Sequence, residues 1–263
     1  MFVDQAFSGG GSTNSSLDNW VAAVAFGLQV YFDFSAYSDM AIGSATLVGI
    51  RLPENFDSPY RSRSPSEFWG RWHMTLSRWI RDYLFFPLNL RAGRRIWLRY
   101  VYLVGVMAMV GLWHGAAMTF VLWGVWHGLL MVAHRLIEKR IPSAVPAWFS
   151  NLAGWAVTFA FVQAGWIFFR APSLGQSLRM IASMATLQSL KPAYGINDYM
   201  LVLFGVVFCL AVEPRIRAFL VRDPNELNLR RWTFWLRPAV YAMGVQFIFM
   251  FDRANVAFIY FQF

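Results

Sequence analysis

One histidine of this chain lies in the middle of a long stretch without charged residues. Residues 101–133 contain no Lys, Arg, Asp or Glu, and His114 lies among them in Gly111-Leu112-Trp113-His114-Gly115. Ionisable side chains are rare in hydrocarbon and are candidates for functional sites. Because the pKa of histidine is ordinarily close to neutral, His114 is a candidate general base that takes a proton from a hydroxyl. The alternative is a structural role, with the imidazole bonded to a carbonyl group and its small neighbours packed against another helix.

A second histidine, His73, lies in a segment rich in arginine. It follows Arg71-Trp72, and Arg78 and Arg81 come shortly after it. Arginine forms bidentate hydrogen bonds with phosphate, so these three arginines are candidates for binding the phosphates of a coenzyme-type thioester donor. The alternatives are a solvated histidine on an amphipathic helix and an ordinary basic loop beside a membrane. The chain has no Gly-rich phosphate-binding loop, which argues against an enzyme that uses nucleoside triphosphates.

Two aspartates and a third histidine also lie in apolar surroundings. A carboxylate in a membrane span costs about 2.5–3.5 kcal/mol, so Asp33 and Asp39 need solvation or pairing, and we expect arginines from residues 51–99 to supply it. A structural ion pair that closes the bundle and a direct catalytic role are both open, and both aspartates are also candidates for binding the substrate or donor. The two aspartates do not share a helix face, which argues against a paired acid/base device. We expect a structural role for His127, although it and Trp113 are also candidates for substrate binding.

The composition indicates a membrane protein. Of the 263 residues, 57% are hydrophobic and 14% are charged, whereas soluble domains have about 25% charged residues. The net charge is +9, but the arginines lie between apolar segments, which argues against nucleic-acid binding. Cys209 is the single cysteine, and no Cys/His spacing predicts a metal site. We expect an all-α polytopic membrane protein without a metal ion or a tightly bound cofactor.

The apolar segments predict about six transmembrane helices. They belong to a membrane domain at residues 20–263, which follows a polar N-terminal loop at residues 1–19. A membrane-spanning helix needs about 20 apolar residues. The predicted spans are residues 20–50, 97–113, 116–134, 149–169, 197–212 and 232–251.

Three basic segments predict how these spans are oriented. They are residues 51–99, 135–140 and 213–231. Cytoplasmic loops of membrane proteins carry an excess of Lys and Arg. If these three segments are cytoplasmic, the six spans alternate in direction and both termini lie outside.

Within the basic segment the sequence predicts one continuous amphipathic helix. Ser64-Pro65-Ser66-Glu67 has the residues of a capping box, with proline at the first helical position. Apolar residues then recur at helical spacing, namely Trp69, Trp72, Leu76, Trp79, Ile80 and Tyr83. We expect this helix to end at Pro87, to lie at the membrane interface or to re-enter the protein, and to carry His73 at the border of its apolar face.

Three blocks of the sequence resemble the membrane-bound O-acyltransferase (MBOAT) family, specifically its bacterial alginate O-acetyltransferase branch. The blocks are residues 29–43, residues 51–56 with 68–83, and residues 111–115 with Trp123-Gly124 and His127-Gly128. The C-terminal residues 258–263 are also typical of this branch. The resemblance extends from about residue 20 to the end of the chain, and it corresponds to the C-terminal half of the family's usual length.

This resemblance implies a bundle of tilted helices around a tunnel in the bacterial inner membrane. It also implies transfer of an acyl group, with acetyl expected, from acetyl-CoA or another cytoplasmic acyl thioester to hydroxyls of an envelope polysaccharide such as alginate. Relatives often hand the group to a separate extracytoplasmic acyltransferase. His114 matches the family's catalytic histidine. His73 matches a second family histidine, and we expect it to join the catalytic site by positioning or polarising the donor. Because of its length, we expect the chain to be a fragment or to need a partner that completes the tunnel.

Three alternative functions stay open. D-alanyl transfer from a carrier-protein thioester to teichoic acid uses the same chemistry. A transporter component, with Asp33, Asp39 and the histidines along a proton or ion path, belongs to a different class, although the sequence has no obvious internal repeat of the kind common in transporters. An inactive remnant that binds a partner is consistent with the short length.

Overall fold

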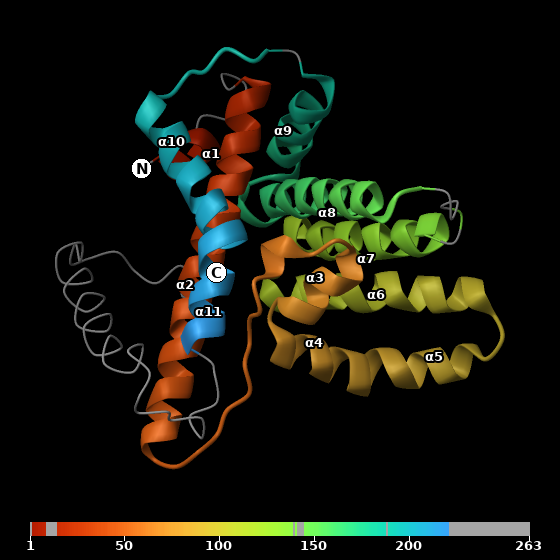
Figure 1. Ribbon diagram of the computed structural model, residues 1–263. Coiled ribbons are helices and arrows are strands. Elements are labelled where there is room, and N and C mark those ends of the chain that lie inside the picture. Colours follow the sequence, from red (N-terminus) through yellow and green to blue (C-terminus); the bar gives the residue numbers. More distant parts are fainter. Residues whose placement is uncertain (1, 9–14, 139, 141–144, 188, 221–263) are drawn as a thin grey trace.

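The computed structural model consists of helices joined by loops (Figure 1). It describes residues 2–8, 15–138, 140, 145–187 and 189–220. No strand occurs among these residues, so the prediction of an all-α membrane protein is confirmed. The predicted span at residues 232–251 and the typical residues 258–263 lie outside the described residues.

Four helical segments of the described chain are long and apolar enough to span a membrane. They are α6 (Ile96–His114), α7 (Met118–Glu138), α8 (Ala147–Arg170) and the segment Ile196–Ala218. The last segment combines α10 (Ile196–Val207), a π-helical turn η3 (Phe208–Val212) and most of α11 (Glu213–Leu220). These four match four of the six predicted spans. The first predicted span forms α2 (Ser16–Leu47), a helix of 32 residues whose apolar sequence is interrupted by polar residues.

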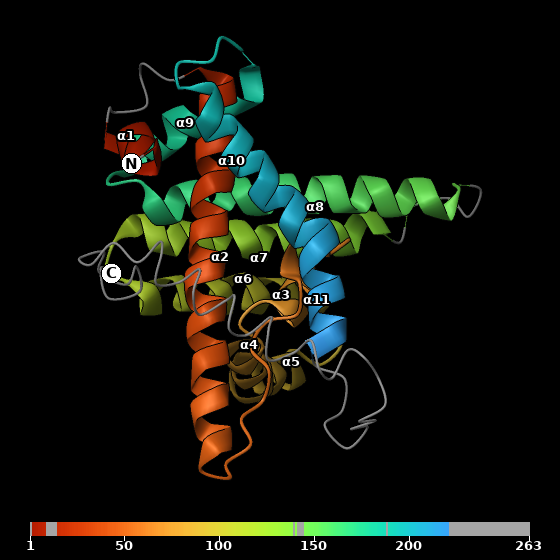
Figure 2. The same cartoon turned by 60° about the vertical axis from the view of Figure 1, so that its left-hand side comes forward.

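The spans α6, α7 and α8 lie side by side, and α2 crosses them (Figures 1 and 2). Helix α2 contacts α8 and α9 (Leu174–Thr186), and α10 runs along it. Large aromatic side chains fill the core where these elements meet, including Phe26, Tyr31, Trp72, Trp123 and Trp166. The crossing therefore positions side chains from α2, α7 and α8 around one central point.

The structure corrects the expected N-terminal loop at residues 1–19. Residues 2–8 form α1 (Phe2–Ser8), which packs against α2. Ser15 caps α2, because its hydroxyl accepts a hydrogen bond from the Asp18 backbone N–H (3.1 Å) while the Asp18 carboxylate accepts one from the Ser15 N–H (2.9 Å). The Gly/Ser-rich composition that suggested a loop lies mostly in residues 9–14, which are outside the described residues.

The predicted continuous amphipathic helix is also corrected, because it is broken after its first two turns. Helix α3 (Pro65–Arg71) is followed by His73 with a positive φ of 42°, and α4 (Met74–Ile80) then begins a new direction. The chain continues through a π-helical turn η2 (Arg81–Phe85) into α5 (Phe86–Ala92). Pro87 lies in the first turn of α5, directly after the π-helical turn, and it does not end the helix.

Burial of Trp72 explains the break. This side chain is 4% exposed and packs against Phe56, Phe68 and Trp166, with ring centroids 5.1–5.5 Å away. Burying a large apolar side chain contributes about 1.5–3 kcal/mol, which offsets the strain of about 1–3 kcal/mol for a residue in the left-handed region. The inward turn of Trp72 thus places His73 inside the protein rather than on the border of an amphipathic helix.

Helices α6 and α7 approach closely through glycine. A Cβ atom on Gly124 would collide with the backbone carbonyl of Met107, and one on Gly111 would collide with that of Phe120. Small residues allow this approach between membrane helices.

We expect Gly124→Ala to lower the midpoint of thermal unfolding in detergent, at a cost of about 1–3 kcal/mol. Gly105→Ala, which has open space around the added methyl, is the matched control, and equal midpoints for the two variants would contradict this account.

Candidate active site

His73 and His114 line one small cavity at the centre of the bundle. His73 lies at the break between α3 and α4, and His114 is the last residue of α6. The cavity measures about 10 Å³, which is room for roughly one water molecule. Its other lining residues are Val30, Trp69, Trp72, Leu76, Trp123, Trp166 and Phe169. The fold therefore brings together two histidines that are far apart in the sequence, within a wall that is almost entirely apolar.

Aromatic rings hold His114 in place. The imidazole lies edge to face with Trp123 and Phe169, and both ring centroids are 5.3 Å away. Trp113 also touches His114, at 4.9 Å between centroids. The indole of Trp113 is nevertheless 64% exposed and does not line the cavity. Of this neighbouring pair, only His114 faces the cavity.

Asn55 fixes the proton on His73. The Asn55 side-chain oxygen Oδ1 lies 3.1 Å from His73 Nδ1 and also accepts hydrogen bonds from the backbone N–H (3.3 Å) and the hydroxyl (2.9 Å) of Thr75. The Asn55 amide nitrogen donates to Ser38 Oγ (3.1 Å). Because a backbone N–H can only donate, Oδ1 is an acceptor and Nδ1 of His73 carries the hydrogen. The other ring nitrogen, Nε2, then has a lone pair.

The surroundings of His73 keep this ring neutral. Burial lowers the pKa of His73 to about 4, and the nearby His114 acts in the same direction. Desolvation disfavours the charged imidazolium, so the neutral form persists well below neutral pH. A neutral ring with its hydrogen on Nδ1 can accept a proton or a hydrogen bond at Nε2.

His127 lies outside this cavity. It is 1% exposed, and it packs against Phe68, Trp69 and Trp123 with ring centroids 5.1–6.1 Å away. Neither ring nitrogen has a hydrogen-bond partner among the described residues. Gly165 on α8 leaves room for the ring, because a Cβ there would lie 2.9 Å from Nε2. His127 is therefore enclosed apart from His73 and His114, and its structural role stays a prediction.

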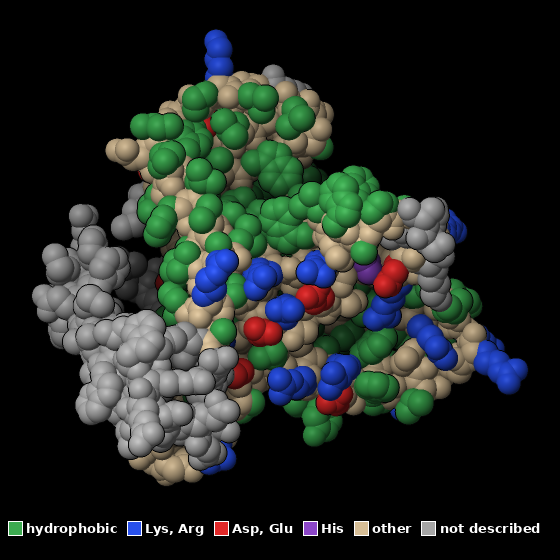
Figure 3. Space-filling view, viewed as in Figure 1, with side chains coloured by type: hydrophobic (Ala, Val, Ile, Leu, Met, Phe, Trp, Pro, Cys, Tyr) green, Lys and Arg blue, Asp and Glu red, His purple; other side chains and the backbone are tan. Residues whose placement is uncertain are grey.

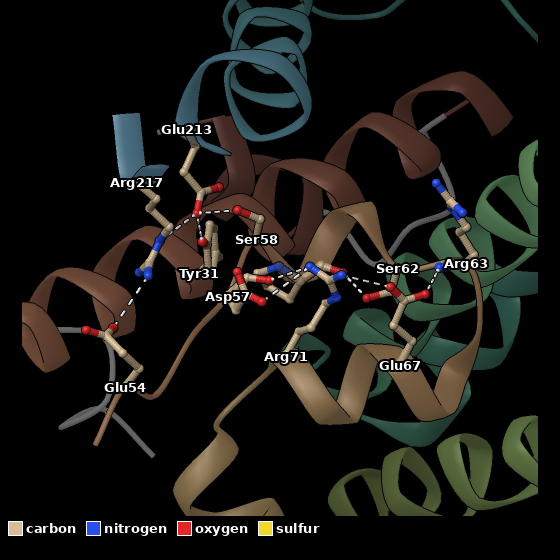
Figure 4. Close-up of polar contacts among 11 residues, drawn as sticks. Tyr31, Glu54, Asp57, Ser58, Ser62, Arg63, Glu67, Arg71, Glu213 and Arg217 are labelled. Carbon is tan, nitrogen blue, oxygen red and sulfur yellow. Dashed lines mark hydrogen bonds and ion pairs between the residues drawn. The ribbon is translucent and has the colours of Figure 1, made fainter. Parts of the chain in front are cut away.

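The structure does not bring the three candidate arginines together. Arg71 lies between the carboxylates of Asp57 (3.4 Å) and Glu67 (3.0 Å), as Figure 4 shows. Arg78 and Arg81 instead line a groove between the α4–α5 segment and helices α6 and α7. In Figure 3, charged side chains of both signs gather over this part of the surface, whereas α8 and α10 are largely covered by hydrophobic side chains. Arg71 and the pair Arg78 and Arg81 would therefore contact phosphate groups at two different places.

The expected partner for Asp39 is corrected. Its carboxylate lies 3.8 Å from Arg217 on α11, rather than beside an arginine of residues 51–99. Arg217 also pairs with Glu54 (3.5 Å) and Glu213 (3.2 Å). Asp33 is half-buried on α2 and does not line the histidine cavity. The sequence could not show this partner, because the chain folds back through α10 and brings the side chain of Arg217 on α11 to Asp39 on α2.

A buried carboxylate links α11 to the rest of the site (Figure 4). Glu213 accepts hydrogen bonds from the hydroxyls of Tyr31 on α2 and Ser58 (3.3 Å) in the loop before α3. Tyr31 in turn packs on Trp72 at 5.9 Å between ring centroids. The network therefore supports the segment that carries His73. Sequence reasoning grouped Glu213 with a basic segment and gave it no role.

Sequence reasoning also missed Asn55 and the walls that α8 contributes. Asn55 lies in a matched block, but nothing in its spacing shows that its side chain meets a histidine 18 residues later. Trp166 and Phe169 face the cavity from the end of α8. The only signal for them in the sequence is the density of aromatic residues in that helix. Within the described residues, no group of three or more His, Cys, Asp or Glu side chains is arranged to hold a metal ion.

Comparison with known proteins decides the family. The model of the membrane-bound O-acyltransferase (MBOAT) family matches residues 13–171, which include both cavity histidines and all the elements from α2 to α8. The chain belongs to this family. The MBOAT match thus confirms the resemblance seen in the sequence.

Individual MBOAT relatives agree. The peptidoglycan O-acetyltransferase of Helicobacter pylori is 32% identical over 270 residues, which is 95% of this chain and 50% of the relative. The probable alginate O-acetylase AlgI of Pseudomonas syringae pv. tomato is 44% identical over 167 residues, covering 64% and 31% of the two proteins. The teichoic acid D-alanyltransferase of Bacillus subtilis is 32% identical over 168 residues, covering 59% and 42%. The matches span about half or less of the length of these relatives.

Proposed function

We propose that this chain contributes the catalytic site of an O-acyltransferase that transfers acetyl from a cytoplasmic thioester to hydroxyl groups of an envelope polysaccharide. The observation that carries the proposal is the pair His73 and His114 on one cavity within a bundle of MBOAT helices. Names of relatives support acetyl as the group and polysaccharide as the acceptor class. The site of action would be the inner membrane, with acetyl-CoA or another acyl thioester as donor.

In this proposal His114 is the general base. Its neutral imidazole takes the proton from the acceptor hydroxyl, and the hydroxyl oxygen attacks the carbonyl carbon of the thioester. The carbon–sulfur bond then breaks, and the departing sulfur takes up the proton from the imidazolium. General-base assistance of this kind contributes about 10²–10⁴-fold to the rate. The apolar wall of Trp123, Trp166 and Phe169 excludes water, which would otherwise compete as acceptor.

His73 has a different role in the same step. With its Nδ1 hydrogen donated to Asn55, the neutral ring offers only an acceptor at Nε2. It can therefore orient a hydroxyl or an N–H group, but it cannot donate a hydrogen bond to the thioester carbonyl. We assign to His73 the role of positioning a substrate.

Two acceptors are compatible with this chemistry. The acyl group would pass directly to polysaccharide or first to an extracytoplasmic acyltransferase partner that completes the transfer.

D-alanyl transfer to teichoic acid is the second candidate function, because the Bacillus subtilis relative aligns with 59% of the chain. The higher identity to the probable alginate O-acetylase, 44% against 32% over alignments of similar length, favours acetyl.

Ester analysis in cells tests the proposal. The complete coding region would be expressed in a host that lacks its own enzyme, with an empty vector as control. Mild base would release esters from purified envelope polysaccharide, and the released acid would be identified by mass spectrometry. We expect acetate. Release of D-alanine would move the assignment to the second candidate, and a properly inserted protein that produces no ester would contradict both.

A further inference from the structure

A second, larger cavity shares one wall with the histidine cavity. It is a groove of about 390 Å³ between the α4–α5 segment and helices α6 and α7. Apolar side chains form most of its lining, including Phe85, Leu103, Val106, Met107, Val110 and Met131. Trp69 of α3 belongs to the lining of both cavities, and no other residue in the described part of the chain does. Its indole is therefore the partition between the groove and the two histidines.

Packing holds the indole of Trp69 in this place. Its ring centroid lies 5.8 Å from Trp123 and 5.3 Å from His127, both in edge-to-face contact. The cavity beyond it has room for roughly one water molecule. A group that passes from the groove to the histidines must therefore be small, unless the partition itself is made smaller.

The polar atoms of the groove describe what it would bind. Arg78 on α4 and Arg135 on α7 have no ion-pair partner among the described residues, whereas Arg81 pairs with Asp82 (2.7 Å). Among its lining residues, Asn89 Oδ1 and Trp69 Nε1 are buried without a hydrogen-bond partner in the described part of the chain. Buried polar atoms are normally satisfied, and because these two residues border a groove with room for a ligand, a molecule bound there can supply the missing donor and acceptor.

These features fit the arm of a phosphorylated thiol better than a lipid. The two arginines offer a site for phosphate, and the unpaired acceptor and donor match the N–H and C=O of an amide. A phospholipid supplies the phosphate, but its acyl chains carry no N–H group for Asn89. Arg78 and Arg135 also lie in basic segments predicted to be cytoplasmic, which is the side from which a thioester donor arrives.

We propose that the groove binds the amide-containing, phosphorylated arm of the thioester donor, and that Trp69 limits the acyl group delivered to the histidine cavity to about the size of acetyl. This inference rests on the proposed acyltransferase function. Acyl transfer itself proceeds as described above, and Trp69 determines which acyl group reaches His73 and His114.

Variants of Trp69 test the size limit. The complete protein in membranes would be given acetyl-, butyryl- and hexanoyl-coenzyme A, and kcat/KM would be measured for each. We expect Trp69→Leu to raise the butyryl-to-acetyl ratio at least about tenfold, because one or two methylenes in an apolar pocket are worth about 10–200-fold. Trp69→Phe keeps a ring for packing and should give a smaller increase in this ratio. It is the variant to use if Trp69→Leu does not fold.

Trp97→Leu is the matched control, since this tryptophan on α6 is 61% exposed and lines neither cavity. Its acyl ratio should equal that of the original protein. Active Trp69 variants with an unchanged ratio would overturn the inference. An original protein that transfers no acyl group from any donor would instead contradict the proposed function.

A second readout tests the donor arm. The double variant Arg78→Gln/Arg135→Gln should raise KM for acetyl-coenzyme A at least about tenfold, because two phosphate contacts are lost. It should leave KM for S-acetyl-N-acetylcysteamine, which has no phosphate, within about twofold. An equal change for both donors would overturn the assignment and would favour a structural phospholipid in the groove.

Discussion

Replacing His114 by alanine in the complete protein should lower the rate of acetyl transfer by about 10²–10⁴-fold. The ring is the base that accepts the hydroxyl proton in the proposed mechanism, and that range is typical of general-base assistance. Because alanine also removes packing against Trp123 and Phe169, His114→Gln is the second variant. Glutamine keeps much of the volume and lacks the basic nitrogen, so it should show the same loss. Ester formation from labelled acetyl thioester in isolated membranes is the measurement.

His134→Ala is the matched control for this prediction. His134 lies on α7, is partly exposed beside Glu138 (3.7 Å) and lines neither cavity. Its variant should transfer acetyl at the original rate, and all variants should be present at equal levels in the membrane. Full transfer by His114→Gln would remove His114 from the proposed mechanism.

Replacing Asn55 should produce the second large effect, and the size of the loss in activity depends on the new residue. We expect Asn55→Leu to lower kcat by roughly 100-fold, because His73 loses the acceptor that orients its ring and misplacement of about 1 Å has effects of that size. Asn55→Asp keeps an acceptor for the Nδ1 hydrogen and should retain more activity. The new carboxylate favours the imidazolium and therefore raises the pKa of His73.

A pH profile separates these two roles of Asn55. In the original protein burial lowers the pKa of His73 to about 4, so His73 causes no loss of activity as the pH falls from 7 to 5. In Asn55→Asp the acid limb of kcat should move to higher pH, because the ring takes up a proton earlier. The titratable group that faces His73 across the cavity is His114, and it is the same in both proteins. Superimposable profiles at full activity would show that Asn55 does not control the His73 proton.

The spans were predictable from local sequence. Segments without charge define α6, α7 and α8 to within a few residues, since hydrocarbon requires continuous apolar helices. The same reasoning found the start of α3, where the Ser64 hydroxyl accepts a hydrogen bond from the Glu67 N–H (3.1 Å). The Glu67 carboxylate, however, accepts from the Arg63 N–H (2.7 Å) instead of closing the predicted box.

The break at Trp72 and His73 was not predictable from periodicity. The spacing of apolar residues across residues 69–83 is helical. Trp72 turns inward because of tertiary contacts, among them those with Phe56 and Trp166, which no local pattern shows. The spacing of apolar residues indicates which side chains prefer to be buried, but it does not indicate which other residues they pack against. A functional residue at such a break therefore cannot be found by assigning residues to the faces of a continuous helix.

The meeting of the two histidines has the same origin. The sequence identified His73 and His114 separately, one from its basic surroundings and one from its apolar surroundings. Their shared cavity depends on the packing of α3, α6, α7 and α8. Likewise, the pairing of Asp39 with Arg217 depends on where the fold places α11 relative to α2. Such long-range arrangements follow from the summed packing of the bundle rather than from any short motif.

The most direct test of the account is a comparison of chemistry with transport in proteoliposomes. The complete protein would be reconstituted with labelled acetyl-coenzyme A and an acidic polysaccharide acceptor, and ester formation and proton flux would be recorded together. The account predicts labelled ester that disappears in His114→Gln, with no proton flux above that of empty liposomes. Proton flux that depends on Asp33 or Asp39, without ester formation, would contradict it and would identify a transporter component.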